Sequence, residues 1–221
     1  MKTFVLRILS LLFGLLLYAI GIVLTIKANI GYAPWDVFHV GLSLTTGISI
    51  GLASIITGIV IVAFVTITGE KIGIGTLANI LLIGIFIDLI IFLDFIPLVR
   101  NFLTGIVVLL AGLFVISLGS YFYIKSAFGA GPRDNLMVVL NRKTKLPVGV
   151  CRSIVELVAT TVGWFLGGMV GIGTIISVVA VGFFIQMTFA VFKFKAAEVK
   201  HENVLQSYKA VKEIIKKAPP S

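Results

Sequence analysis

Six apolar runs, each close to the length that crosses a lipid bilayer, divide the sequence. A membrane-spanning helix requires about 20 apolar residues because the hydrocarbon core is about 30 Å thick. The runs are Phe4 to Ile26, Ser49 to Thr68, Leu77 to Leu93, Phe102 to Ile124, Val148 to Val170 and Ile175 to Phe192. Since 59% of the 221 residues are hydrophobic and 12% are charged, the composition excludes an ordinary soluble domain. The sequence predicts an all-α polytopic membrane protein with six transmembrane helices.

The second half of the chain repeats the pattern of the first half at a constant offset of 98 residues. The segment IKANIGYAPWDVFHVGLS, which begins at Ile26, returns as IKSAFGAGPRDNLMVVLN from Ile124. The motif GIGT at residues 73–76 returns at residues 171–174. Proline and aspartate are rare in this chain, yet both fall into register. Two halves that merely share a leucine- and glycine-rich composition would not show this match, so the sequence indicates an internal duplication.

Each copy contains three predicted spans, and this odd number determines how the copies insert. Because successive spans cross in opposite directions, the second copy must enter the membrane inverted relative to the first. We therefore expect two inverted three-helix repeats, each with a short helix after its first span. The predicted domains are residues 1–98 and 99–195, followed by a basic tail at residues 196–221.

Basic residues predict the orientation, because short cytoplasmic loops carry an excess of lysine and arginine. With the N-terminus inside, fifteen of the 18 basic residues fall on the cytoplasmic side. Lys27 and Arg100 fall outside, and Arg152 lies within a span. The sequence thus predicts a multi-pass inner (plasma) membrane protein with both termini in the cytoplasm. This distribution also explains the net charge of +9 without a nucleic-acid partner.

A repeated loop precedes each short helix. Its structural residues are Lys27, Gly31 and Pro34 in the first copy and Lys125, Gly129 and Pro132 in the second. Proline is favoured in the first turn of a helix, and a following aspartate suits the helix dipole. PWD and PRD therefore predict short helices at about residues 35–46 and 133–144. These helices either insert and pack into the bundle or lie at the surface as amphipathic connections.

Polar residues in or beside the spans supply the candidate substrate-binding set. The set is Asp36, Asp134, Asp88, Gln186, Arg152 and Glu156. Ionisable side chains within a bilayer are costly and usually face a cavity or a partner, and broken helices of inverted repeats often hold the substrate. For Asp88 and Gln186 the alternative is an interhelical hydrogen bond or a helix end near the outer interface. Arg152 and Glu156 are four residues apart and can pair on one helix face, for substrate contact, gating or structure alone.

The remaining motifs favour structural roles. Thr76 and Thr174 are expected to cap helices, Cys151 to pack within a span and Trp35 to lie in the outer aromatic belt. We expect His39 at the interface, with a pH-sensitive position beside Asp36 as the alternative. Seven glycines predict close helix packing: Gly14, Gly21, Gly58, Gly84, Gly112, Gly119 and Gly182. We find no phosphate-binding loop, metal motif or nucleophile with a base, so we expect no enzyme and no cofactor.

The tail predicts a basic amphipathic helix. Its apolar stripe is Val204, Tyr208, Val211 and Ile215, surrounded by lysines. Such a helix suits the anionic cytoplasmic leaflet or a protein partner.

The segments NIGYAPWDVFHVGLSLTTGISIG and AGPRDNLMVVLNRKTKLPVGV, with both GIGT motifs, resemble the YczE/YyaS/YitT family of bacterial integral membrane proteins. The resemblance covers about residues 10–190 and implies a small polytopic inner-membrane protein. We expect a transporter or permease for a small solute or ion that works by alternating access. The alternatives are a regulator or scaffold that engages a cytoplasmic partner through its tail and, third, a lipid-modifying enzyme. Glycine-rich faces also allow a homodimer.

Overall fold

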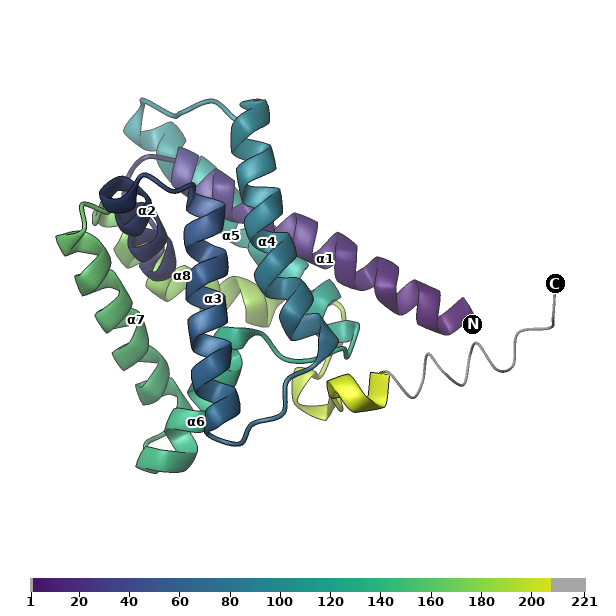
Figure 1. Cartoon of the computed structure of the whole chain (residues 1–221). Helices are drawn as coiled ribbons and strands as arrows, with labels where there is room; N and C mark the ends of the chain where they lie inside the picture. Colours follow the sequence, from purple (N-terminus) through teal and green to yellow (C-terminus); the bar gives the residue numbers. More distant parts are fainter. Residues whose placement is uncertain (1, 208–221) are drawn as a thin grey trace.

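The structure is a computed structural model that describes residues 2–207 (Figure 1). Its helices are α1 (Lys2–Lys27), α2 (Pro34–Thr46), α3 (Ile50–Ile67), α4 (Ile74–Leu93), α5 (Phe102–Lys125), α6 (Pro132–Thr144), α7 (Val148–Phe165), α8 (Ile172–Val191) and the short 3₁₀ helix η1 (Ala196–Glu198). Six of them, α1, α3, α4, α5, α7 and α8, are long and apolar enough to cross a membrane. The predicted all-α fold with six spans is therefore confirmed.

The repeat offset holds for whole helices and not only for motifs. The bounds of α6, α7 and α8 lie 98 residues after those of α2, α3 and α4 at both ends. The two short helices begin at the prolines that predicted them, Pro34 and Pro132, each in the first turn. The opposite orientation of the two copies in a membrane stays a prediction.

Three span boundaries differ from the prediction by three residues or more, for local reasons: the starts of the third and sixth spans and the end of the fifth. The third span begins at Ile74 instead of Leu77, because the Gly73 N–H donates to the Thr76 hydroxyl at 3.3 Å and starts the helix one turn earlier. The equivalent bond in the second copy measures 3.2 Å, so both predicted threonine caps are confirmed. The fifth span ends at Phe165 because Gly167 turns the chain with a φ of 93°.

Helices α1 and α5 cross at the centre of the molecule through glycines. A Cβ on Gly14 would lie 2.6 Å from the backbone nitrogen of Tyr123, and one on Gly119 would lie 2.7 Å from that of Tyr18. Gly21 and Gly112 make a similar approach further along. Close packing at these predicted glycines is therefore confirmed.

Each GIGT turn holds the entrance of the other copy's short helix. The Gly75 N–H donates to the Phe128 carbonyl at 2.8 Å, and the Gly173 N–H donates to the Ile30 carbonyl at the same distance. The Thr76 hydroxyl adds a 2.7 Å bond to the Ala130 carbonyl. The two repeated motifs are therefore partners across the halves, which explains why both occur twice.

The short helices also pack across the halves: α2 lies against α7, and α6 lies against α3. In α2 the buried residues include Pro34, Asp36, Val37, His39, Val40 and Gly41, so this helix packs into the bundle. In α6 the last turn is exposed, and Arg142 pairs with Glu70 at 2.6 Å. The two alternatives predicted for the short helices therefore both occur. Helix α2 packs into the bundle, and helix α6 lies partly at the surface.

The start of the tail lies against the loops of both halves. Glu202 pairs with Arg7 at 2.7 Å, and its N–H donates to the Ala127 carbonyl at 2.8 Å. The Val204 N–H donates to the Ile72 carbonyl at 3.1 Å. The predicted stripe beyond residue 207 lies outside the described residues.

Candidate functional site

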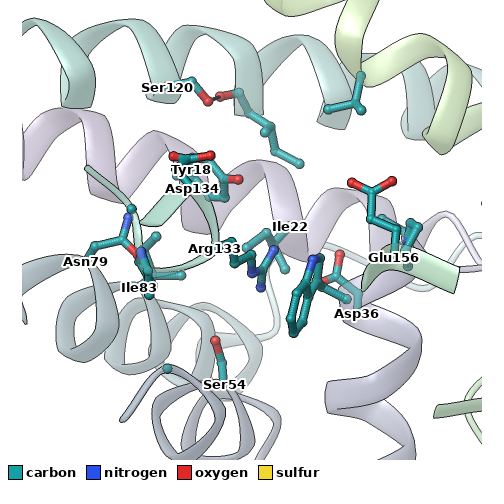
Figure 2. Close-up of a pocket in the computed structure, with 18 of the residues that line it drawn as sticks. Tyr18, Ile22, Asp36, Ser54, Asn79, Ile83, Ser120, Arg133, Asp134 and Glu156 are labelled. Carbon is teal, nitrogen blue, oxygen red and sulfur yellow. Dashed lines mark hydrogen bonds between the residues drawn. The ribbon is translucent and has the colours of Figure 1, made fainter. Parts of the chain in front are cut away.

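A cavity of about 350 Å³ lies between the two halves, with walls from all eight α-helices or their entrances. Figure 2 shows side chains from both halves around this space, among them Asp36, Ser54, Arg133 and Glu156. The short helices α2 and α6 both begin at the cavity, so their positive N-terminal ends face it. The fold therefore places its two broken segments at one central site.

Most of the lining residues come in pairs at the repeat offset. The polar and aromatic pairs are Tyr18 with Ile116, Ile22 with Ser120, Trp35 with Arg133, Asp36 with Asp134, His39 with Met137, Ser54 with Arg152, Gly58 with Glu156 and Asn79 with Ser177. Both copies thus contribute the same positions to one cavity. The side chains differ within most pairs, so the two walls of the cavity are chemically distinct.

Trp35 and Arg133, which are equivalent residues, contact each other across the halves. The Arg133 guanidinium carbon lies 4.7 Å from the centre of the Trp35 ring, within cation–π distance. The predicted place of Trp35 in an outer aromatic belt is therefore wrong, because its ring lines the cavity. No ion pair among residues 2–207 includes Arg133.

The two equivalent aspartates line the cavity in different surroundings. Asp36 is 3% exposed, and its Oδ1 lies 3.8 Å from Nδ1 of His39. Burial lowers the pKa of His39, so its imidazole is neutral at pH 7. The expected interfacial position of this histidine is wrong, because the side chain is buried. Asp134 lines the cavity with part of its surface exposed; desolvation there raises the pKa of its carboxyl, and Arg152, Arg133 and the Gly131 backbone oppose this rise.

Arg152 and Glu156 form the predicted pair on α7. The Arg152 Nε donates to Oε1 of Glu156 at 2.8 Å, and both residues line the cavity. The Glu156 side chain is 15% exposed and that of Arg152 is 47% exposed. The arginine therefore has free surface beyond its partner.

The sequence analysis missed many of the cavity residues, among them Arg133, Tyr18, Asn79 and Ser177. Ser177 is 1% exposed, and its hydroxyl has no hydrogen-bond partner among the described residues. A buried hydroxyl without a partner costs free energy, which makes it a candidate ligand contact. The repeat itself could have identified Asn79 and Ser177, because both are polar residues at equivalent positions within spans.

Asp88 and Gln186 do not line the cavity. The Asp88 carboxylate accepts from the Ser49 hydroxyl at 2.5 Å and from the Gly51 N–H at 2.8 Å, so it caps the start of α3. The interhelical alternative therefore describes Asp88 in this structure. Gln186 lies on the exposed face of α8.

The predicted loop residues shape the entrances of the short helices. Gly31 and Gly129 adopt φ angles of 114° and 134°, which favour glycine. Lys27 pairs with Asp94 at 2.8 Å, and Lys125 donates to the Tyr121 hydroxyl at 3.0 Å. Lys27 therefore links the ends of α1 and α4, Lys125 bonds within α5, and neither lysine lines the cavity.

The site offers binding groups of both charges on apolar walls. Neither Arg133 nor Asp134 forms an ion pair among residues 2–207. No group of three histidine, cysteine or acidic residues in the described part of the chain could hold a metal ion. The arrangement suits reversible binding of a small polar molecule.

Comparison with known proteins identifies relatives. Residues 5–189 match a family of unknown function (DUF6198). The chain is 37% identical over 178 residues to the uncharacterized membrane protein YczE of Bacillus subtilis, covering 79% of this chain and 81% of that protein. It is 30% identical over 176 residues to an uncharacterized protein of Haemophilus influenzae, covering 80% of each. The Bacillus subtilis protein YyaS is 28% identical over 167 residues. No solved structure matches.

Proposed function

The chain belongs to the DUF6198 family of membrane proteins, and from this premise we propose that it is a transporter for a small polar solute. The observation that carries the proposal is the central cavity, whose walls consist of equivalent residues from two copies of one unit. Inverted-repeat transporters bind their substrate at such an interface, between helices that are broken near the membrane midplane.

The charged groups of the cavity suggest a zwitterion. Arg133 presents a planar guanidinium that suits a carboxylate or similar oxyanion, and the N-terminal ends of α2 and α6 favour the same charge. Asp134 presents an accessible carboxylate next to it, which suits an ammonium group. Apolar walls such as Ile80 and Val181 accommodate a short side chain. An amino acid or a compound of similar size has this combination of groups.

The proposed mechanism uses the two copies as rocking units. The substrate binds between them, and a change in their mutual orientation exposes the cavity to one side of the membrane and then to the other. With the predicted orientation, the protein lies in the plasma membrane of a bacterium with both termini in the cytoplasm. The lysines of the tail then face the anionic inner leaflet.

Ligand binding to the purified protein in detergent tests the proposal. A panel of amino acids, organic acids, organic cations and inorganic ions is screened by thermal unfolding, because a ligand that binds the folded state raises the melting temperature. We expect a zwitterion to raise it for the wild type and to have no effect on Arg133→Gln or Asp134→Asn. Lys143→Gln is the control, because it removes a charge from the exposed end of α6. Equal shifts in all variants would contradict the assigned site.

The tail contacts favour a second function, a regulator that responds to a cytoplasmic partner. Glu202 binds Arg7 at the entrance of α1, so a partner that captured the tail would disturb the loops that it contacts. Deletion from Lys200 onward distinguishes the two functions. A transporter retains ligand-dependent thermal shifts after this deletion, whereas a regulator loses its partner and shows no shift with the panel.

A further inference from the structure

The two halves contain the same helices, but only one half brings its last two helices together. Helix α3 packs along α4, as Figure 1 also shows, while their counterparts α7 and α8 make no comparable contact. Helix α7 instead lies against α2, and α8 lies against α5. The duplicated architecture is therefore asymmetric at one pair of interfaces.

The contact between α3 and α4 is made by backbone and by one carboxylate. A Cβ on Gly51 would overlap the carbonyl oxygen of Gly84, so the two helices touch directly. Asp88, one turn further along α4, accepts hydrogen bonds from Ser49 and Gly51 at the start of α3. Both helices also line the cavity, so this contact joins two parts of its wall.

The equivalent glycines in the second half make no close contact. A Cβ on Gly149 or on Gly182 would have no atom within 4 Å, although their equivalents Gly51 and Gly84 are in tight contact. Close packing at Gly182, predicted from the sequence, is therefore absent from this structure. Glycine is less favourable than alanine within a helix, so a glycine at an open position gains nothing from its small size. Gln186, the equivalent of Asp88, likewise presents its amide to the outside of the bundle.

Helices α7 and α8, which carry these open glycines, both line the cavity. Arg152, which lines the cavity, lies one turn after Gly149, and nearly half of its side chain is exposed. Ser177 and Val181 border the cavity on α8, the latter next to Gly182. The same two helices therefore line the cavity without packing closely on each other at the end where Gly149 lies.

We propose that α3–α4 and α7–α8 are two gates of the transport cavity, and that the structure shows the first closed and the second open. In the opposite state, Gly149 contacts Gly182, the Gln186 carbonyl accepts from the start of α7, and the contact of Asp88 with Ser49 and Gly51 breaks. With the predicted orientation the open gate faces the cytoplasm. This inference rests on the proposed transport function.

The side chains explain which state is preferred. A carboxylate accepts stronger hydrogen bonds than a neutral amide, so Asp88 holds its gate more firmly than Gln186 can hold the other. Pro147 replaces Ser49 in the second half and removes a hydroxyl donor. Both differences favour the state in which the α3–α4 gate is closed.

Accessibility of a cavity cysteine tests the gates without a known substrate. Ser54→Cys is placed in a Cys151→Ser background, and its labelling by a membrane-impermeant maleimide is measured in intact cells and in inside-out vesicles. Gly182→Leu fits the open space at that position but blocks closure. We expect it to lower labelling from outside about ten-fold or more by shifting a two-state population, with labelling from inside maintained. Asp88→Asn should raise labelling from outside.

The control is Val179→Leu, which enlarges a side chain that is 73% exposed on the same helix. If the cysteine at position 54 is labelled from both sides, and equally in Gly182→Leu and in this control, the proposed gates are wrong while the proposed transport function still stands. Labelling from one side only in every variant would overturn alternating access itself. A disulfide-linked dimer of Gly182→Cys would assign this face to a second copy of the chain and overturn the gate.

Discussion

The two short helices cross to the opposite half in the same way but pack by different means. Helix α2 touches α7 through glycines: a Cβ on Gly41 would overlap the Gly163 carbonyl, and one on Gly163 would overlap the backbone of Phe38. At the equivalent positions α6 and α3 carry Val139 and Val65, which are both fully buried and pack in one apolar cluster. One interface is therefore a backbone contact, and the other depends on interlocking side chains.

This difference between the two interfaces bears on the two proposed gates. The helix bounds are conserved between the halves, but substitution of glycine by valine changes how closely the helices approach. Helix α7, held against α2, is separated from α8, while α3 is free to pack on α4. The asymmetric interfaces therefore provide a physical basis for two unequal gates.

The largest expected effect comes from a side chain in the glycine interface. Gly163→Val forces branched carbon atoms into the backbone of α2, which cannot move without displacing the helix. We expect the variant to lose about 3 kcal/mol or more of the free energy of unfolding. Thermal unfolding in detergent measures this loss, and Val162→Ile, at a position 42% exposed, is the control. A wild-type melting temperature would show that α2 and α7 do not touch.

A cavity in the valine interface should have a smaller effect. Val139→Ala removes two buried methyl groups from the contact of α6 with α3. We expect a loss of about 2 kcal/mol, from lost apolar burial and the space left behind. The same unfolding assay compares it with Val138→Ala at the neighbouring position, which is 49% exposed. Equal stabilities of these two variants would contradict the packing described for α6.

The ion pair at the exposed end of α6 should contribute less to the free energy of unfolding. Arg142 pairs with Glu70 at 2.6 Å and donates to the Thr68 carbonyl at 2.7 Å, while the equivalent residue of α2 is Leu44. Because the Arg142 side chain is half exposed, Arg142→Ala should cost about 1 kcal/mol or less. Raising the salt concentration should reduce the difference from the wild type. A loss as large as that of Val139→Ala would indicate that this end is buried.

The smallest effect is confined to acidic pH and to α2. Burial lowers the pKa of His39, with Arg133 adding to the effect and Asp36 opposing it. Below about pH 6.5, His39 binds a proton in the unfolded chain but not in the folded chain. The free energy of unfolding therefore decreases as the pH is lowered. Melting temperatures at pH 8 and pH 5 should therefore differ less for His39→Gln than for the wild type. Parallel changes would place His39 in water.

The spans and the short helices could be predicted because run length, proline and the repeat determine them locally. The packing partners of these helices could not be predicted. A repeat specifies which positions are equivalent, but not whether a helix packs on its own copy or on the other copy. Trp35 and His39 were assigned to the interface because the position of a residue relative to the spans indicates its depth in the membrane. It does not indicate which side chains of the other copy the residue faces. Asp88 shows the same limit, because a buried carboxylate that caps a helix and one that binds a ligand look alike in sequence. Close packing at Gly182 is absent from this structure, and the proposed opposite state of the gates would supply it.

Opposite orientation of the two halves is the central claim, and cysteine accessibility at α2 and α6 tests it most directly. Thr46 and Thr144 are equivalent, exposed and each at the end of its short helix. In a Cys151→Ser background, Thr46→Cys should react with an impermeant maleimide in intact cells, and Thr144→Cys should react only in inside-out vesicles. Labelling of both cysteines from the same side would show that the halves are not inverted and would contradict the account.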